Sequence, residues 1–537
     1  MHRSWPAGRD SVEPELDFLG NSHGSTESRP TFPSVTDALP ETRFHPVNPV
    51  ILSLLCFVLT SPATAQIQQA WVARYNNGIT NGTNQAVKMA LDSTGNIYVA
   101  GFSQNANSNL GYVTIKYAPN GNQLWVAPYD STNYPSATPS GLVLDNSNNV
   151  IVTGNALTIK YDTNGNQLWT APYDGNAVAV DAAGNPVVTG FASGFNTVKL
   201  SPSGTNLWLA TYNEPLGPVL SQVVLGDSGS NVYVAGTDTY FNEKGFRYQQ
   251  LLIVKYDQNG NQLWTAANSQ GGGPIATVQV EGIAIDIGKN ICLVANLIGG
   301  AAPGYETFRY DDAGNLIWIA YPNENLTSRS SGLALGNAGD LFLTGKAGND
   351  YPNFFYGTFE VGSNGSPLWT NFYPQPSVGV SVASSIVTDS ANNCYVTGYS
   401  PGTNSGNDIV TIKYGPNGNQ IWLQRYNGPG NGDDAGNAIA VDNKGNVYVT
   451  GYETTAAGGT EIVTIKYSPV TLQRRSDGTV LLQAQGTNGE SFDFQGSTDL
   501  MNWLDLGSVL ADSNGLAQFA DTNASNYNWR FYVTSPQ

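Results

Sequence analysis

A short four-part pattern recurs along most of the chain and limits what it can fold into. In residues 418–467 the pattern reads GNQIWLQRY, NAIAVD, KGNVYVTG and IVTIKY. Each segment is rich in Val, Ile, Tyr or Trp and is bounded by Gly, Asn or Asp, which is the composition of strands joined by tight turns. Self-similarity with a period of about 40–55 residues indicates a propeller or a solenoid.

Three markers of this unit each occur eight times. The unit has a first strand of small residues, a second strand of the NVYVTG type, a third of the VTIKY type and a fourth that carries tryptophan. The tryptophans are Trp71, Trp125, Trp169, Trp208, Trp264, Trp318, Trp369 and Trp422. The second strands end at Gly101, Gly154, Gly190, Gly236, Ala295, Gly345, Gly398 and Gly451, and the third near Tyr117, Tyr161, Leu200, Tyr256, Tyr310, Glu360, Tyr414 and Tyr467.

The order of the strands distinguishes a ring from a solenoid. The repeats begin with a lone fourth strand, AWVARY at Ala70–Tyr75, and end with a lone set of the first three strands at Asn437–Tyr467. The first strand can therefore complete the last unit, which leaves no open sheet edge between the two ends. We predict an all-β chain with an eight-bladed β-propeller, or alternatively a seven-bladed one, closed by the N-terminal strand. The short units Trp125–Trp169 and Trp169–Trp208 are expected to keep four strands.

The turns between the strands have their own chemistry. Third and fourth strands are joined by Asn-Gly segments such as PNGN at Pro119–Asn122, and Asn-Gly is the strongest short hairpin signal because both residues tolerate positive φ. First and second strands are joined by D-x-x-G-N, as in Asp92–Asn96, where the Asp side chain accepts backbone N–H groups. The tryptophans are expected to pack between neighbouring blades rather than to form a ligand platform.

Two of the Asn-Gly turns also resemble calcium loops. They begin at Asp162 and Asp257 and place Asn residues two and four positions later. A Ca²⁺ site needs about six to eight oxygen ligands, and the known loop is longer and ends in a bidentate Glu. Turn chemistry is the favoured interpretation, with Ca²⁺ as the alternative, and no cofactor is expected.

The composition of the chain limits the classes of molecule that it is expected to bind. Charged residues make up 12% of the 537 residues and the net charge is −18, against roughly 25% charged residues in ordinary domains. An acidic chain of this kind argues against nucleic-acid binding, which needs basic patches, and against adhesion to anionic lipid.

The N-terminal residues predict export. Residues 1–48 form an irregular, Pro-rich leader, which suggests a start site placed too far upstream. PVILSLLCFVLT at Pro49–Thr60, followed by Ala63-Thr64-Ala65, is typical of a signal peptide (49–65) cleaved before Gln66. The apolar run is too short for a confident membrane span, so no transmembrane anchor is expected in the mature chain.

Cleavage before Gln66 would change the residue inventory. The mature chain would carry 19 basic and 34 acidic residues, net −15, and no histidine. That excludes a Ser-His-Asp or Cys-His arrangement and a His-ligated metal. The remaining cysteines, Cys292 and Cys394, occupy different faces of equivalent strands, so we expect two buried thiols and no disulfide.

The repeat resembles a known bacterial pattern. DNKGNVYVTGYETTAAGGTEIVTIKY and IVTIKYGPNGNQIWLQRYNGPGNGDDAGNAIAVD are similar to the SBBP-type β-propeller repeat, over roughly Trp71–Tyr467. The resemblance implies a secreted or envelope protein and supplies no catalytic motif. The fifth unit departs from it at Ala295, where Gly is usual in the second strand. The sixth departs at Gly336, where Asp is usual, and at Glu360 in the third strand.

A second domain is predicted after the propeller (66–469). Residues 473–537 contain GTVLLQAQG, ESFDFQGSTDLMNWLDLG, GLAQFAD and NWRFYVTS, which indicate five or six short strands and a small β-sandwich. STDLMNW and the closing RFY resemble C-terminal β modules of large secreted proteins of environmental bacteria. That resemblance implies an accessory or sorting role.

Candidate binding residues lie on loops of one propeller face, because loops positioned by a scaffold carry function. Asp433 and Asp434 lie in NGPGNGDDAGN and could hold a metal or sugar hydroxyls, although a solvated loop is favoured. The segment Thr237–Gln250 forms an aromatic-rich loop suited to sugar or protein contacts, unless its rings only cover a blade edge. Its aromatic residues are Tyr240, Phe241, Phe246 and Tyr248.

These observations favour a non-enzymatic binding or scaffold protein. It would be secreted, periplasmic or attached to the outer envelope of a bacterium, with a polysaccharide or a surface protein as partner. The alternatives are propeller enzymes. A quinoprotein-like dehydrogenase is suggested by GNQLW, but its adjacent Cys pair is missing because Cys292 and Cys394 are far apart. A polysaccharide-degrading enzyme would need two carboxylates across a cleft, and the sequence does not single out such a pair.

Overall fold

The protein is described from a computed structural model. The described residues are 67–130, 134–190, 194–212, 220–268, 277–298, 304–322, 328–350, 353–373, 379–486, 489–499, 501–513, 515–527 and 530–536. The leader and the signal peptide expected at residues 1–65 lie outside these ranges. The described residues are mostly strand, so the predicted all-β class is confirmed. Within these ranges no helix has the length and hydropathy of a membrane span.

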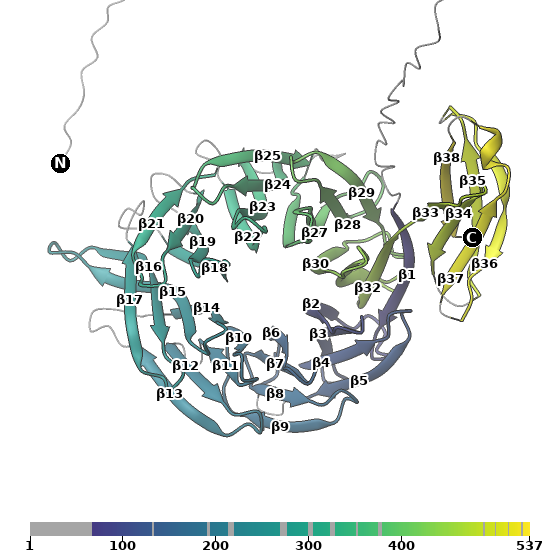
Figure 1. The fold of residues 1–537 in the computed structure, drawn as a ribbon. Coiled ribbons are helices and arrows are strands. Elements are labelled where there is room, and N and C mark those ends of the chain that lie inside the picture. The colour runs from purple at the N-terminus through teal and green to yellow at the C-terminus, as the bar shows by residue number, and fades with distance from the viewer. Residues whose placement is uncertain are drawn as a thin grey trace, which may run out of the picture. The chain divides into compact units, whose positions relative to one another are not determined.

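Eight four-stranded antiparallel sheets account for residues 67–469 of the described chain (Figure 1). Sheet 1 contains β2 (Asn84–Leu91), β3 (Ile97–Gln104), β4 (Leu110–Tyr117) and β5 (Gln123–Tyr129). Sheet 2 contains β6 (Pro139–Leu144), β7 (Val150–Gly154), β8 (Thr158–Tyr161) and β9 (Gln167–Ala171). Sheet 3 contains β10 (Ala177–Val180), β11 (Pro186–Thr189), β12 (Phe195–Leu200) and β13 (Asn206–Tyr212). The two short units therefore keep four strands, as predicted.

The next four sheets follow in chain order. Sheet 4 contains β14 (Leu220–Gly226), β15 (Val232–Phe241), β16 (Arg247–Tyr256) and β17 (Gln262–Asn268). Sheet 5 contains β18 (Thr277–Ile285), β19 (Ile291–Ile298), β20 (Gly304–Tyr310) and β21 (Leu316–Ala320). Sheet 6 contains β22 (Ser328–Leu335), β23 (Leu341–Asp350), β24 (Asn353–Val361) and β25 (Pro367–Tyr373). Sheet 7 contains β26 (Val382–Thr388), β27 (Cys394–Pro401), β28 (Asn407–Tyr414) and β29 (Gln420–Tyr426). The departures at Ala295, Gly336 and Glu360 thus leave sheets 5 and 6 with four strands each.

Sheet 8 joins the two ends of the repeat region. Its strands are β30 (Ala435–Val441), β31 (Val447–Thr454), β32 (Thr460–Pro469) and β1 (Ile67–Tyr75). β1 pairs with β32 along almost its whole length, from Ile67 opposite Pro469 to Tyr75 opposite Ile462. The predicted pairing of the N-terminal strand with the last unit is confirmed.

The first strands of the sheets contact one another in chain order. β2 contacts β6, and the series continues through β10, β14, β18, β22 and β26 to β30, which in turn contacts β2. Figure 1 shows these first strands nearest the middle of the repeat region. The middle strands are buried on both faces and read as continuous apolar runs, whereas the fourth strands alternate, as in the partly exposed β13. The fold consists of repeated four-stranded sheets, as in a β-propeller.

The turns between third and fourth strands differ in detail from the prediction. Between β4 and β5 only Gly121 has positive φ, at 86°, and its N–H donates to the carbonyl of Ala118. The strand register shifts by one residue at Lys116 and Tyr117. A four-residue turn followed by a left-handed Gly and a bulge therefore forms these hairpins, instead of the two-residue turn that Asn-Gly most often indicates.

Residues after 469 form two three-stranded antiparallel sheets. One contains β33 (Thr471–Arg474), β34 (Val480–Gln485) and β37 (Leu516–Asp521). The other contains β36 (Leu504–Leu510), β35 (Ser491–Ser497) and β38 (Phe531–Pro536), with the 3-10 helix η2 (Ala524–Asn526) between β37 and β38. Leu482 from the first sheet and Phe494 from the second belong to one buried cluster. Five or six short strands were predicted here, and six are present.

Candidate functional site

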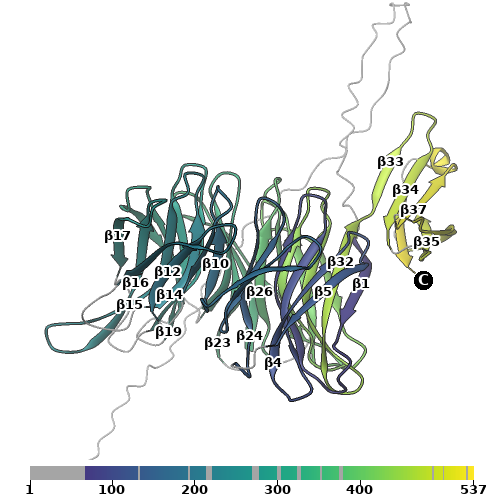
Figure 2. The same cartoon turned by 90° about the horizontal axis from the view of Figure 1, so that it is seen from below.

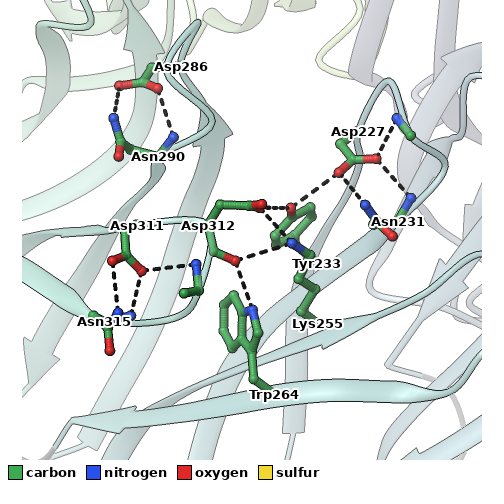
Figure 3. Close-up of polar contacts among 12 residues, drawn as sticks. Asp227, Asn231, Tyr233, Lys255, Trp264, Asp286, Asn290, Asp311, Asp312 and Asn315 are labelled. Carbon is green, nitrogen blue, oxygen red and sulfur yellow. Dashed lines mark hydrogen bonds and ion pairs between the residues drawn. The ribbon is translucent and has the colours of Figure 1, made fainter.

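The turns between first and second strands carry a repeated carboxylate network. Asp227, at the end of β14, accepts the backbone N–H groups of Gly229 and Asn231 through Oδ1, both at 2.8 Å. Its Oδ2 accepts the Asn231 side chain at 2.8 Å and the Tyr233 hydroxyl at 3.2 Å (Figure 3). Asp227 thus caps its own turn, and Asp92 does the same in the D-x-x-G-N turn Asp92–Asn96, where it accepts the N–H groups of Thr94 and Asn96, as predicted.

In six of the eight sheets a Lys or Arg side chain of the third strand bonds an oxygen of the next sheet, whereas sheet 6 has Glu360 at this position. Lys255 on β16 bonds the Asp312 carboxylate at 2.6 Å and the Asp312 carbonyl oxygen at 3.2 Å. Trp264 donates to the same carbonyl at 3.0 Å, and Tyr233 donates to the carboxylate at 2.8 Å (Figure 3). The Lys255 hydrogen bond is the largest influence that holds the pKa of Asp312 below its usual range. These side chains join neighbouring sheets and have few polar atoms left for a ligand.

The two turns that resemble calcium loops are of the same capped kind. Asp257 accepts Asn259 N–H and Asn261 N–H through Oδ1 and the Asn261 side chain through Oδ2, at 2.8 to 2.9 Å. Asp162 makes the equivalent bonds with its own turn. In the described part of the chain, no three His, Cys, Asp or Glu side chains come together as a metal ion would need. The geometry is that of a turn, the interpretation favoured from the sequence.

The tryptophans pack between sheets, as predicted. Seven of the eight donate their indole N–H to a carbonyl oxygen in the next sheet's turn, at 3.0 to 3.3 Å. A Cβ atom on the left-handed glycine of that turn would approach the ring within 3.0 Å, as at Gly314 beneath Trp264. Glycine is therefore required there both by its φ of 86° and by the ring. A turn glycine thus lies against each of these seven rings, and their indole N–H groups are used between sheets.

Asp433 and Asp434 do not form a common site. Asp433 accepts the backbone N–H and the side chain of Asn407 at 2.9 and 3.0 Å. Asp434 is fully buried and accepts the backbone N–H groups of Gly428 and Thr454. Desolvation raises the pKa of Asp434. The solvated-loop interpretation is wrong for Asp434, because its carboxylate joins its own loop to the end of β31 by hydrogen bonds.

A carboxylate pair that the sequence did not single out lies near the same end of sheet 8. Glu453 on β31 and Glu461 on β32 are directly opposite each other. The Arg74 guanidinium lies 2.5 Å from Glu453 and 3.7 Å from Glu461, and Tyr426 also donates to Glu453. The Glu453 side chain is fully buried, so this group is a connection between β1 and its neighbours rather than a pair across a cleft.

The aromatic segment Thr237–Gln250 is not a loop, as the sequence suggested, but an extension of β15 and β16. Four residue pairs, from Asp238 opposite Gln250 to Phe241 opposite Arg247, continue this hairpin past its pairing with β14. The hairpin projects beyond the rest of its sheet in both views (Figure 1, Figure 2). Alternating β-branched and aromatic residues favour the longer strands, which the loop interpretation had overlooked.

The hairpin tip holds its aromatic rings in a defined arrangement. Tyr240 and Tyr248 stack with their centroids 5.5 Å apart and their planes 19° apart. Asn242 caps the turn by accepting the N–H groups of Lys244 and Phe246, and it donates to the Tyr248 hydroxyl at 3.4 Å. Phe241 and Phe246 are 44% and 53% exposed. The tip thus carries the four predicted aromatic residues, with Tyr240 and Tyr248 stacked on one face and Phe241 on the other, and it leaves Phe241 and Phe246 open to solvent.

Two charged residues of the first strands were missed by sequence reasoning. Lys88 on β2 and Glu281 on β18 line a cavity between the first strands of sheets 1 to 5. The signal was available, because a charged residue interrupts the small, apolar pattern in NQAVKMAL and in TVQVEGIAI. Without the sheet arrangement, nothing in the sequence indicated that these two strands face a common space.

Comparison with known proteins identifies the same kind of repeat. Residues 421–452 match the SBBP beta-propeller repeat. A curated relative, the uncharacterized WD repeat-containing protein L264 of Acanthamoeba polyphaga mimivirus, is 25% identical over 485 residues. The match covers 76% of this chain and 32% of the relative, so the chain spans about a third of the length of that relative. The predicted resemblance to SBBP repeats is confirmed.

Solved structures show only distant similarity. A polysaccharide lyase, Uly1, is 8% identical over 74% of this chain and 91% of its own, with a TM-score of 0.39. A protein of unknown function from Dyadobacter fermentans is 10% identical over 76% of this chain and 100% of its own, with a TM-score of 0.36. At these TM-scores the similarity says nothing about function.

Proposed function

We propose that this chain is a non-enzymatic binding protein that recognises a neutral polysaccharide with the tip of the β15–β16 hairpin. One observation carries the proposal. The tip combines the stacked pair Tyr240 and Tyr248 with the exposed rings of Phe241 and Phe246. An exposed aromatic cluster on a capped hairpin has no role in the sheet core and is suited to recognition.

The chemistry of the tip suits a sugar chain. Aromatic rings offer flat apolar faces to the C–H surfaces of a sugar ring, while tyrosine hydroxyls hydrogen-bond at the edge. Asn242 fixes the turn through backbone bonds, so little conformational entropy is lost when a ligand packs on the tip. The net charge of −18 would repel polyanions. A neutral polysaccharide therefore fits better than a uronic-acid polymer.

The scaffold in this proposal is a closed ring. We infer that the eight four-stranded sheets are the eight blades of one propeller and that β1 closes it. The pairing of β1 with β32 and the contact of β30 with β2 support this inference. We also infer that the two C-terminal sheets form a β-sandwich, and that the chain is exported to the exterior or envelope of a bacterium by the signal peptide predicted at residues 49–65.

Retention on insoluble polysaccharides tests the proposal. Residues 66–537 are compared with a variant in which Tyr240, Phe241, Phe246 and Tyr248 are all replaced by Ala. A matched control removes four equally exposed apolar side chains from fourth strands. The control residues are Leu124, Leu168, Leu207 and Leu263, which are 50% to 52% exposed.

Each outcome decides between named possibilities. Loss of retention in the aromatic variant alone, with no release of sugar ends, supports the hairpin as the binding surface. Retention by the aromatic variant, but not by a chain ending at Pro469, would move glycan binding to the C-terminal sheets. If none of the proteins is retained, recognition of a surface protein becomes the better hypothesis. If sugar ends are released, the chain is an enzyme that cleaves the polysaccharide, and the binding hypothesis is wrong.

A further inference from the structure

A cavity of about 600 Å³ lies among the first strands of sheets 1 to 5. Its lining includes Lys88 from β2, Ser140 from β6, Asn176 just before β10, Gln222 from β14, and Gln279 and Glu281 from β18. Figure 1 shows these strands facing the middle of the repeat region. Ligand sites in proteins occupy roughly 300–1,000 Å³, so the space is large enough for a small molecule.

Short side chains let the first strands approach one another and define this space. A Cβ atom on Gly141 of β6 would lie 2.9 Å from Val178 of β10, and one on Gly282 of β18 would lie 2.9 Å from Leu333 of β22. Larger residues at these glycines would push neighbouring sheets apart. The cavity wall is therefore tightly packed, and the polar groups on it are held by a rigid frame.

A one-residue bulge recurs at the same place in seven of the first strands. Bulges redirect side chains and are frequent beside functional sites. The residues at these bulges are Val87, Ser140, Gln222, Glu281, Ser331, Ser384 and Asn437. Ser140 and Gln222 use their side chains to bond the next sheet, through Gly175 O and Val280 N–H. Glu281 is the charged member of this set, and it lines the cavity.

Two charges of opposite sign meet in the cavity. Lys88 and Glu281 come from sheets that are four sheet-to-sheet contacts apart. Glu281 accepts the Asn296 side chain at 3.0 Å, whereas Lys88 has no hydrogen bond to any described residue. Desolvation lowers the pKa of Lys88 and Glu281 opposes the lowering. Desolvation also raises the pKa of Glu281. The hydrogen bond from Asn296 and the charges of Lys88 and of Arg329 on β22 oppose this increase. Lys88 is exposed and Glu281 is half-buried, so both charges are open to a ligand in the cavity.

We propose that this cavity binds a small zwitterion, an amino acid or a short peptide, with its carboxylate on Lys88 and its ammonium on Glu281. A simple anion would satisfy Lys88 and be repelled by Glu281, and a simple cation would do the reverse. A neutral sugar would pair with neither charge and would gain no ion pair from the cavity. A ligand with both charges pairs each group, and Asn176, Gln222 and Gln279 supply polar contacts between them.

Calorimetric titration of residues 66–537 with glycine, diglycine and triglycine tests the proposal. N-acetylated and C-amidated forms of the same probes remove one ligand charge at a time without altering the protein. We expect at least one parent probe to bind, and its acetylated and amidated forms to bind at least tenfold more weakly. Equal binding of the blocked and parent forms would overturn the proposal, as would no binding of any parent probe.

Charge reversal in the protein provides the second readout. Lys88→Glu and Glu281→Lys should each weaken binding at least tenfold, and the double variant should recover most of the loss because the ligand can bind in the opposite direction. Lys444→Glu, in an exposed turn outside the cavity, is the matched control and should bind like the parent. If the double variant binds no better than the singles while its melting temperature stays normal, the proposed pairing is wrong.

Discussion

The indole nitrogen of Trp71 donates a hydrogen bond of 3.1 Å to the carbonyl oxygen of Pro119. Trp71 lies on β1 and completes sheet 8, whereas Pro119 lies in the turn between β4 and β5 of sheet 1. Lys466 on β32 donates to the same oxygen at 3.1 Å. The contact between sheets 8 and 1 thus repeats the Trp-to-turn contact seen between neighbouring sheets along the chain. A strand from the start of the repeat region takes part in it.

Replacement of Trp71 by Phe should lower the free energy of unfolding by about 1–2 kcal/mol, because a buried hydrogen bond is lost and the ring becomes smaller. Trp422→Phe is the matched control. No carbonyl acceptor is recorded for Trp422 among the described residues, since β32 is not followed by a hairpin into a fourth strand. Urea unfolding measures both changes, and an equal effect of the two substitutions would show that the Pro119 bond contributes nothing.

The glycine beneath each tryptophan gives a second prediction. Gly121 has φ of 86°, and an added Cβ would lie 2.8 Å from the Trp71 ring. Gly458 has φ of 95° with nothing within 4 Å of the same position. Gly121→Ala should therefore lower the free energy of unfolding clearly more than Gly458→Ala does. In Gly458→Ala only backbone strain acts, and it lowers that free energy by about 1 kcal/mol. Thermal melting compares the two, and a larger loss in Gly458→Ala would contradict the packing argument.

Buried and exposed turn carboxylates should differ in their response to loss of charge. Lys160 lies 2.7 Å from Asp145, and both side chains are almost fully buried. Asp145→Asn leaves that ammonium without its counter-ion and should cost about 3–5 kcal/mol. Asp162→Asn removes an exposed charge and keeps an oxygen for the two backbone turn bonds, losing only the bond from the Asn166 side chain, so it should change stability far less. Denaturant midpoints measure the stability of both variants. Similar losses of stability in the two would contradict the role assigned to Lys160.

Glu306 predicts a pH dependence of stability. It lies on β20, is 2% exposed, and Oε1 has no partner among the described residues. Desolvation raises its pKa to about 7, while Tyr321 opposes the increase. The folded state therefore binds more protons than the unfolded state between about pH 4.5 and 7, and stability should fall as pH rises through this window, by up to about 1.4 kcal/mol per pH unit.

The variant Glu306→Gln should remove that part of the slope, because Gln does not titrate. Glu360, whose pKa is also raised to about 7 by desolvation, should keep its own contribution in the variant. Glu243→Gln, on the exposed hairpin tip, is the control and should follow the parent protein. Urea midpoints measured from pH 4.5 to 7.5 test this, and parallel curves for the parent and Glu306→Gln would exclude the buried Glu as the cause.

Much of the fold was readable because it repeats. The tryptophans, the D-x-x-G-N turns and the Tyr-ending strands recur in the same order, so a weak local signal is confirmed by its neighbours. The pairing of β1 with β32 followed from the lone strand at Ala70–Tyr75 in the same way. The sequence also predicted that the tryptophans pack between sheets. A ring packed in this way cannot also serve as a platform for a ligand.

The errors occurred where only one unit departs from the repeat. Thr237–Gln250 has turn residues at its centre and was taken as a loop, but pairs such as Tyr240 with Tyr248 extend the strands around a four-residue turn. Asp434 was assigned to a solvated loop because its partners are Gly428 in its own loop and Thr454 at the end of β31, twenty residues further along the chain. Lys88 and Glu281 line one cavity although three sheets lie between theirs along the chain, and sequence distance carries no such information.

The ring proposed for this chain depends on closure by β1, and one crosslink tests that closure directly. Ala73 on β1 lies opposite Thr464 on β32, whereas Val463 is one residue out of register and belongs to the other face of the strand. In residues 66–537, Ala73→Cys with Thr464→Cys should form an intramolecular disulfide under mild oxidation, found by peptide mass spectrometry, and should raise the melting temperature. Ala73→Cys with Val463→Cys should not. Equal crosslinking of the two pairs, or crosslinks only between molecules, would show that β1 does not close the ring.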